Sequence, residues 1–269
     1  MIEIPFDPEL HLGPIALAWH GIFTAVGIFF GVWLPVRLLR GRVDEDAAYS
    51  IATWGVVGGI IGARLLHVAD RWDFYSQHLE QIPQIWSGGI AVWGAAVGGV
   101  LGGLIVALRR RDIPIGGTAD AAAPGIGLGF AIGRIGDIIN GEHHSNPCEG
   151  FGLCVGYTHP ATLGQAGPVH LVVAYEMVWN LIGVGLALLL RRPLRMEPEG
   201  RIFWLWLIWY AIGRLAFGFI RIDDPLVTSG LRQDQIMGVL ALVLAIPVLA
   251  LLQAGVLSRA LARFRRAAP

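Results

Sequence analysis

Seven apolar segments constrain the fold of this 269-residue chain more than any other feature of its sequence. A helix needs ~20 mostly apolar residues to cross a bilayer, and each segment has about that length. They span residues 14–37, 50–69, 88–108, 119–139, 168–190, 202–221 and 234–255. The composition agrees, since 55% of the residues are hydrophobic and the mean hydropathy is +0.60, which excludes a soluble enzyme. We therefore predict an all-α polytopic membrane protein with about seven transmembrane helices.

Charges in the connecting segments predict how the chain lies in the membrane. Arginines follow the first, third, fifth and seventh apolar segments, whereas the other connections are acidic or mixed. The positive-inside rule then places the N-terminus outside and the C-terminus in the cytoplasm. We predict one transmembrane domain over residues 1–269, with an irregular outer-face segment at about 141–167. The formal net charge of zero argues against a protein that binds nucleic acid.

The outer segment contains both cysteines of the chain, Cys148 and Cys154. A disulfide suits an oxidising outer face, two free thiols are the alternative, and the CEGFGLC spacing matches no common zinc site. Small residues recur in two other places, GVVGGIIGARLL at 55–66 and GAAVGGVLGGL at 94–104. These runs predict close packing of two helices, and the alternative is a wall that lets lipid tails pass.

The stretch GRIGDIINGE, residues 133–142, places four polar side chains at the end of the fourth apolar segment. A charged side chain at bilayer depth costs roughly 2.5–3.5 kcal/mol, so we expect a specific role for Arg134, Asp137, Asn140 and Glu142. On a helix, the first three of these fall near one face.

Further charges lie within other apolar segments: Arg64 in the second, Glu176 in the fifth and Arg214 in the sixth. One hypothesis is structural pairing, of Arg134 with Asp137 and of Arg64 with Glu176. The other hypothesis is an arginine-rich cavity in which Arg64, Arg134 and Arg214 bind a phosphate. The arginines in these segments outnumber the available carboxylates, which favours the cavity.

Five stretches of the chain, taken in order, resemble the prolipoprotein diacylglyceryl transferase family. LGPIALAWHGIFTAVGIFFG (12–31) looks like the family's opening, and GARLLHV (62–68) like its second-span arginine motif. GRIGDIINGE is similar to the signature GRxGNFxNGE, which is the most specific match. HLVVAYE (170–176) resembles HPxQLYE, and WYAIGRLAFGFIR (209–221) resembles YGxxRFxxEFxR. The resemblance covers nearly the whole chain.

The resemblance implies a multi-pass enzyme of the bacterial cytoplasmic (inner) membrane that needs no cofactor and no metal. Such an enzyme moves the diacylglyceryl group of phosphatidylglycerol to the lipobox cysteine thiol of a preprolipoprotein and releases glycerol phosphate. Its partners would be phosphatidylglycerol, preprolipoprotein signal peptides and membrane lipids. Carried over by motif, Arg134 and Arg214 hold the lipid phosphate, and Asn140 and Glu142 organise the head-group pocket. Arg64 supports this pocket.

The chain departs from the family pattern where the chemistry is expected. Trp93 stands where the family has a histidine, and an indole cannot accept a proton. Asp137 replaces the first asparagine of the signature, and His20 replaces the tyrosine of the opening motif. Gly218 replaces a glutamate, and MGV at 237–239 replaces MGQ.

Several hypotheses account for these departures. In one, the chemistry is retained and His20, with an unperturbed pKa of about 6.5, has become the proton acceptor, although a lone histidine in a helix often serves packing. In another, a divergent paralogue binds, moves or transfers a phospholipid group to another acceptor, or is a non-catalytic membrane protein. A transporter or flippase is a further class, but no internal repeat supports it. The predicted catalytic residues are His20, Glu142 and Tyr210, and the predicted substrate-binding residues are Arg64, Arg134, Asp137, Asn140 and Arg214.

Overall fold

The structure is a computed structural model that describes residues 1–85, 88–89, 91–110, 112–191, 197–223, 226–228 and 230–255. The chain divides into two compact units. Unit 1 consists of Met1–Pro35 and Ala119–Pro269, and unit 2 is Val36–Thr118. The organisation as one transmembrane domain stays a prediction.

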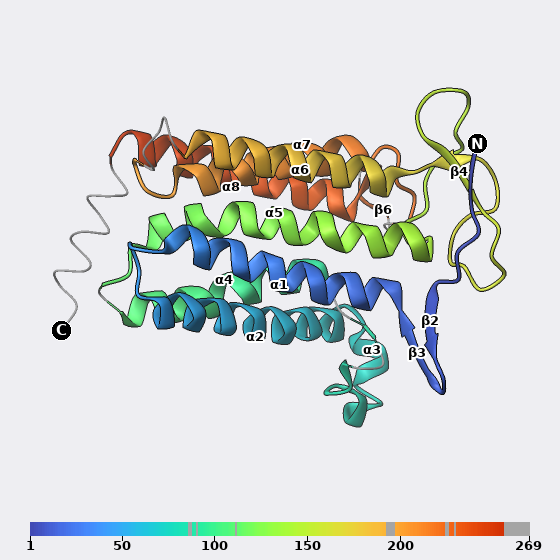
Figure 1. Cartoon of the computed structure of the whole chain (residues 1–269), viewed down its shortest axis with the longest axis horizontal. Coiled ribbons are helices and arrows are strands. Elements are labelled where there is room, and N and C mark those ends of the chain that lie inside the picture. Colours follow the sequence, from blue (N-terminus) through green and yellow to red (C-terminus); the bar gives the residue numbers. More distant parts are fainter. Residues whose placement is uncertain are drawn as a thin grey trace. The chain divides into compact units, whose positions relative to one another are not determined.

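Helices make up most of the described chain (Figure 1). They are α1 Trp19–Leu39, α2 Glu45–Asp70, α3 Trp72–Tyr75, the 3-10 helix η1 Leu79–Gln81, α4 Val92–Arg109, α5 Ile115–Asn140, α6 Val172–Leu190, α7 Arg201–Phe217 and α8 Gln233–Gln253. Six helices within the described ranges, namely α1, α2, α4, α5, α6 and α8, are long and apolar enough to cross a membrane. The chain is thus a multi-pass membrane protein. Helix α7 lies where the sixth span is predicted, and its 17 residues extend about 25 Å.

Some predicted helix boundaries differ from the structure because neighbouring residues pair as strands. Helix α1 begins at Trp19 rather than near residue 14, since β2 (Glu9–Leu12) and β3 (Ile15–Ala18) form an antiparallel hairpin. The hairpin turns at Gly13, whose φ of +63° suits glycine. These residues are apolar, so composition alone assigns them to the helix.

A small sheet in unit 1 corrects the expectation of an all-α chain. Its strands are β1 (Ile2–Ile4), β4 (Cys154–Tyr157) and β5 (Val169–His170), in the order β1-β4-β5. The β1–β4 pair is parallel and the β4–β5 pair is antiparallel. A disulfide joins Cys148 to Cys154, so the disulfide alternative is the correct one. The segment 141–167, predicted as irregular, therefore contains a strand and a covalent link. A second short hairpin is formed by β6 (Leu226–Thr228) and β7 (Leu231–Arg232).

Small residues let α1 approach α5 closely within unit 1. A Cβ added to Gly27 would lie 2.6 Å from the backbone oxygen of Gly129, and one added to Gly136 would lie 2.6 Å from the Cα of His20. The first turn of α1 is therefore held against the last turns of α5. The start of α6 and the end of α7 lie at the same end of unit 1 (Figure 1).

Two tryptophans join α6 to α7. The indole nitrogen of Trp179 donates to the carbonyl of Trp209 at 2.9 Å, and that of Trp209 donates to the carbonyl of Trp179 at 3.0 Å. Their rings stack with centroids 3.9 Å apart. Gly183 and Gly213 leave the room that these two rings occupy, so this crossing has a defined register.

Helices α2 and α4 pack against each other in unit 2 through glycines. A Cβ added to Gly98 would lie 2.9 Å from the Cα of Gly62, and one added to Gly94 would lie 2.7 Å from the Cβ of Leu66. The prediction that the two glycine-rich runs pack closely is confirmed.

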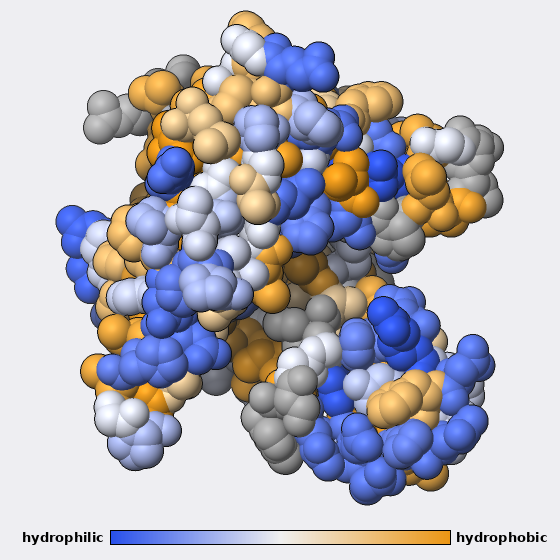
Figure 2. Space-filling view, turned by 90° about the vertical axis from the view of Figure 1, so that its right-hand side faces the viewer, coloured by the Kyte–Doolittle hydropathy of each residue, from blue (hydrophilic) through white to orange (hydrophobic). Residues whose placement is uncertain are grey.

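The outer surfaces of the helices carry many large apolar side chains. Phe29 is 62% exposed, Leu189 70% and Val243 65%, as expected for side chains that face lipid. By contrast, the face of the molecule shown in Figure 2 carries many hydrophilic residues among apolar ones.

Candidate functional site

The end of α5 positions three of the predicted residues. Gly141 follows the helix with a φ of +77°. The backbone N–H groups of Gly141 and Glu142 both donate to the carbonyl oxygen of Asp137, at 3.0 and 3.2 Å. This left-handed ending needs glycine and turns the chain out of the helix. The side chain of Asn140 then donates to Glu142 Oε1 at 3.1 Å. The signature stretch thus forms a helix end whose polar groups contact one another.

His20 reaches Asp137 because Gly136 allows α1 to lie against α5. The distance from His20 Nδ1 to Asp137 Oδ1 is 2.5 Å, and that from His20 Nδ1 to Glu142 Oε2 is 3.5 Å. The Asp137 side chain is 5% exposed, whereas that of His20 is 39% exposed. An ionised carboxylate can only accept, so Nδ1 carries the proton in this contact. The other ring nitrogen, Nε2, is then available as a proton acceptor when the imidazole is neutral.

Glu176 of α6 binds three arginines from different parts of unit 1. Its Oε2 lies 2.6 Å from Arg134 Nη2, and its Oε1 lies 3.3 Å from Arg214 Nη1 and 3.2 Å from Arg221 Nη1. Arg134 also binds Asp137 Oδ2 at 2.7 Å, which confirms the predicted pair one helical turn apart. We call Arg134, Asp137, Glu176, Arg214 and Arg221 the charged cluster. All five side chains are at most 13% exposed.

Tyr210 and Arg214 contact each other one turn apart on α7. Arg214 Nε donates to the Tyr210 hydroxyl oxygen at 2.9 Å, and the guanidinium lies 5.5 Å from the centre of the Tyr210 ring. Asp234, at the start of α8, lies 4.0 Å from Arg214 Nη1. Tyr210 therefore fixes the direction in which the Arg214 side chain extends.

Two residues outside the predicted site, His143 and Asp223, extend the cluster into the loops. His143 Nδ1 lies 2.8 Å from Asp223 Oδ2, and His143 Nε2 lies 3.5 Å from Asp137 Oδ2. Burial opposes the charged form of His143, but the contacts with Asp137 and Asp223 outweigh it and raise the pKa of His143. Burial also opposes the charge of Asp223, yet His143 and Arg221 hold the pKa of Asp223 well below its usual range.

The loop geometry explains why His143 reaches this position. Its φ is +72°, in the left-handed region, and the next residues pair with the chain after α7. Asn146 N donates to Ile220 O at 2.9 Å, and Ile222 N donates to His144 O at 3.0 Å. The signals in the sequence are weak: a histidine directly after the signature glutamate, and a glycine before it.

His20, Asp137 and Glu142 also have the ligand types of a cation site, with their ligand atoms within 4.8 Å of one another. Two atoms that share a zinc ion, each about 2 Å from it, would lie more than about 3 Å apart. The 2.5 Å separation of His20 Nδ1 and Asp137 Oδ1 is instead that of a short hydrogen bond. The geometry is therefore that of a hydrogen-bonded acid–base pair.

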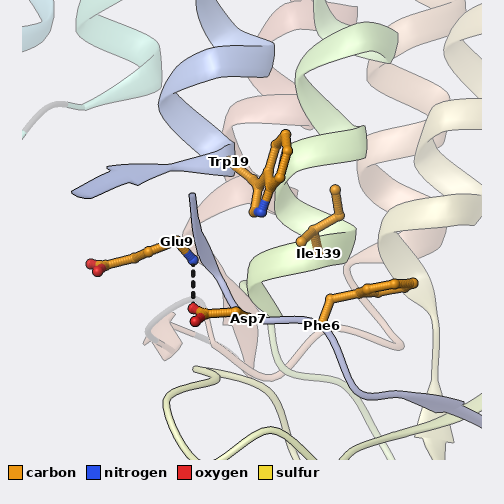
Figure 3. Close-up of a pocket in the computed structure, with 5 residues that line it drawn as sticks. All are labelled: Phe6, Asp7, Glu9, Trp19 and Ile139. Carbon is orange, nitrogen blue, oxygen red and sulfur yellow. Dashed lines mark hydrogen bonds between the residues drawn. The ribbon is translucent and has the colours of Figure 1, made fainter. Parts of the chain in front are cut away.

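An apolar pocket of about 370 Å³ is lined by Trp19, which directly precedes His20, and by Ile139, two residues after Asp137 (Figure 3). Trp19 of α1 and Ile139 of α5 lie side by side in it, and Phe6 borders it from the N-terminal segment. Asp7 and Glu9 form its polar edge, where Asp7 Oδ1 accepts from the backbone N–H of Glu9 at 2.9 Å. The pocket can hold a hydrocarbon group.

Arg64 belongs to unit 2 and has a different environment. Its guanidinium donates to the backbone carbonyls of Gln81, Ile82, Gly88 and Gly89 at 2.6 to 2.9 Å. The hypothesis that Arg64 pairs with Glu176 is therefore wrong, since Glu176 binds Arg134, Arg214 and Arg221 instead.

The other predicted site residues come together in unit 1. The expectation that arginines outnumber carboxylates is wrong there. Among the described residues, the three arginines of the cluster are matched by Asp137, Glu176 and Asp223, with Asp234 at 4.0 Å. Sequence position did not reveal this balance, because Asp223 lies outside the predicted segments and Asp234 is only the first residue of the seventh.

The chain is similar to known proteins over most of its length. The model of the prolipoprotein diacylglyceryl transferase family matches residues 9–251. A phosphatidylglycerol–prolipoprotein diacylglyceryl transferase of Geobacillus kaustophilus is 36% identical over 243 residues, which are 88% of each protein. A relative of the same name from Thermosynechococcus vestitus is 37% identical, over 87% of this chain and 88% of the relative. One from Staphylococcus carnosus is 33% identical, over 90% and 89%.

Proposed function

The chain belongs to the prolipoprotein diacylglyceryl transferase family, and we propose that it transfers the diacylglyceryl group of phosphatidylglycerol to the lipobox cysteine thiol of a preprolipoprotein. The sulfur forms a bond to the glyceryl carbon that carries the phosphate ester. The bond from that carbon to the ester oxygen breaks, glycerol phosphate leaves with the bonding electrons, and the thiol proton passes to a base. The protein must therefore bind a phosphate, offset its growing charge and accept a proton.

The observation that carries the proposal is the convergence of Arg134 and Arg214 on Glu176. These are the arginines that match the family's two signature motifs, and Glu176 holds both guanidinium groups at one end of unit 1. Within the described residues no hydrogen bond is found from Arg134 Nε or from Arg214 Nη2. A phosphate oxygen can use these donors while the other nitrogens stay on the carboxylate. Glu176 then positions the two cations and Tyr210 orients Arg214.

His20 is the proton acceptor in this proposal. Its imidazole is the exposed partner of a buried carboxylate, so Nε2 can meet a thiol while Nδ1 stays on Asp137. A thiol attacks as its thiolate, and a base orientated by a third group is the usual way to form one. This arrangement supports a positioning role for Asp137 rather than contact with the head group. It also supplies the proton acceptor that Trp93 cannot provide.

Asn140 and Glu142 complete the proposed site beside His20. Glu142 is 26% exposed and lies 3.5 Å from His20 Nδ1, so it favours the imidazolium that forms when the thiol proton arrives. Asn140 is 5% exposed and fixes Glu142 through its amide nitrogen. The apolar pocket beside Trp19 suits the hydrocarbon part of the lipid or of the acceptor peptide.

We infer a topology of seven spans, in which α7 crosses the membrane in addition to the six long apolar helices. The arginine-rich connections would then lie in the cytoplasm, the N-terminus outside, and the charged cluster near the outer face of a bacterial inner membrane. The Cys148–Cys154 disulfide supports this orientation, because disulfides persist on the oxidising side. The role predicted for Arg64 in the head-group pocket stays a prediction, since the contacts of Arg64 lie within unit 2.

The test is complementation of a transferase-depleted bacterium that carries a tagged preprolipoprotein. We expect mass spectrometry to find the diacylglyceryl group on the lipobox cysteine with the wild-type chain, and none with Arg134→Ala or Arg214→Ala. Arg110→Ala is the control, because Arg110 is an exposed arginine paired with Asp112 in unit 2. Absence of the lipid with well-expressed wild-type protein would contradict the proposal. Lipid movement in reconstituted vesicles without a thioether product would favour the lipid-moving alternative.

A further inference from the structure

The connection after α2 in unit 2 folds around the buried side chain of Arg64. Arg64 is 6% exposed, and its nitrogens donate to four backbone carbonyls between Gln81 and Gly89. Its guanidinium also lies 5.1 Å from the centre of the Tyr75 ring. No carboxylate lies within ion-pair distance of Arg64 among the residues that the structure describes. Carbonyl oxygens fix this cation but do not neutralise it.

Arg64 lines a cavity of about 430 Å³ in unit 2. Two further basic side chains, His67 and Arg71, lie on the same stripe of α2 at its end, one turn apart. Gln81 and Gln84 contribute amides. No carboxylate is among the described residues that line this cavity. A concave site of this size suits a small ligand, and its uncompensated charge selects an anion.

The backbone of the cavity is shaped by two glycines. Gly88 and Gly89 have φ values of +81° and +75°, and their carbonyls both point at Arg64. A Cβ on Gly89 would lie 2.5 Å from His67 Nε2 and 2.8 Å from Arg64 Nη1. The absence of a side chain at Gly89 therefore leaves the room that His67 and Arg64 occupy. Arginine presents a planar fork that matches phosphate oxygens, and Arg71 is exposed at the mouth of the cavity.

We propose that this cavity is a second anion site, which binds a phosphate group through Arg71 and His67 over the fixed charge of Arg64. The ligand is a phosphate ester, either the head group of an anionic membrane lipid or a free soluble ester, and phosphatidylglycerol and sn-glycerol phosphate are the probes for the two. The site is built entirely within unit 2 and differs from the charged cluster of unit 1. The proposal does not depend on the transfer reaction.

The test measures phosphate binding by purified protein in phosphatidylcholine nanodiscs. In one arm, phosphatidylglycerol is added to the nanodiscs, and native mass spectrometry counts the lipids retained on the protein. In the other arm, calorimetry follows the binding of soluble sn-glycerol phosphate. The variants are Arg71→Gln/His67→Gln and, as a second probe of the lining, Gln84→Leu. Arg110→Gln is the matched control in unit 2, and Arg134→Ala reports on the charged cluster separately.

We expect Arg71→Gln/His67→Gln to weaken binding by about tenfold or more in at least one arm, because charge-assisted hydrogen bonds are lost. Gln84→Leu should weaken it less, and Arg110→Gln should leave it unchanged. A loss in the lipid arm alone identifies a lipid head group, and a loss in the soluble arm alone identifies a free ester. The lipid lost with Arg134→Ala should be a different one. A variant that combines Arg134→Ala with Arg71→Gln/His67→Gln should therefore retain fewer lipids than either variant alone. Unchanged binding in both arms by folded variants, or an equal loss with Arg110→Gln, would overturn the proposal.

Discussion

His20 Nδ1 and Asp137 Oδ1 lie 2.5 Å apart, although 117 positions separate the two residues in the chain. By the resemblance drawn from the sequence, both residues depart from the family's motifs, with histidine in place of tyrosine and aspartate in place of asparagine. Each departure alone is unfavourable, because it places an ionisable group in a membrane protein interior. Together they form a pair that can hold and release a proton. We infer that the two substitutions belong together and form the acid–base pair of this chain.

Glu176 should be essential for stability because it binds three buried arginines. We expect Glu176→Gln to destabilise the protein by about 3–5 kcal/mol, since it leaves buried charge uncompensated. An anionic lipid should restore part of this loss by supplying the missing charge. Thermal unfolding in phosphatidylcholine and in phosphatidylglycerol nanodiscs measures both effects. Equal unfolding temperatures for variant and wild type in phosphatidylcholine would show that Glu176 does not organise the arginines.

Asp120 should matter for stability but not for the reaction. Asp120 is fully buried. Its two carboxylate oxygens accept hydrogen bonds from the backbone N–H groups of Gly200 and Phe203, at 2.8 and 2.9 Å, at the start of α7. It lies about 25 Å along α5 from Asp137. We expect Asp120→Ala to cost about 1–2 kcal/mol of stability, as for a lost helix cap, and to leave kcat/KM unchanged. A large drop in kcat/KM at full folding would contradict this separation.

The glycine contact between α2 and α4 predicts a contrast between two glycines of α2 that lie about two turns apart. A Cβ on Gly62 would lie 2.9 Å from the Cα of Gly98, whereas one on Gly55 would meet nothing closer than 3.6 Å. Gly62→Ala should therefore lower the unfolding temperature. Gly55→Ala should leave it unchanged or raise it, because alanine favours a helix by up to about 1 kcal/mol. The same response in both variants would argue against tight packing at Gly62.

The His143–Asp223 contact predicts a pH dependence of stability. The folded protein raises the pKa of His143, so this contribution is complete below the unfolded value of about 6.5 and is lost as the pH rises through the folded value. The folded protein lowers the pKa of Asp223, so that contribution is present above about pH 4 and is lost on acidification. Stability should therefore fall from pH 6 to pH 9. The fall should be smaller in His143→Gln, and identical slopes would contradict the assignment.

The positions of the long helices could be predicted from sequence because hydrophobicity along one segment is a local property. The strands could not, since β1 and β4 pair across about 150 residues and each is only a few residues long. Local apolar residues such as Ile15 and Leu17 gave no sign that they form a hairpin rather than the start of α1.

The site shows the same division between local and distant contacts. The Arg134–Asp137 pair follows from helical spacing, and the structure contains it. The role of Glu176 depends on how three helices pack. His143 enters the cluster through a turn in which Gly141 and His143, on either side of Glu142, both have a positive φ. Neither can be read from spacing.

The most direct test of the central claim is a double-mutant cycle on His20 and Asp137, measured as kcat/KM against pH. We expect His20→Gln to lower kcat/KM by about 100-fold or more and to remove its rise with pH, as for a lost general base. Asp137→Asn should lower it less, and the double variant should be no worse than His20→Gln, because the two residues act as one unit. His11→Gln, on the exposed hairpin, is the control. Full activity and an unchanged pH profile in folded His20→Gln would contradict the account.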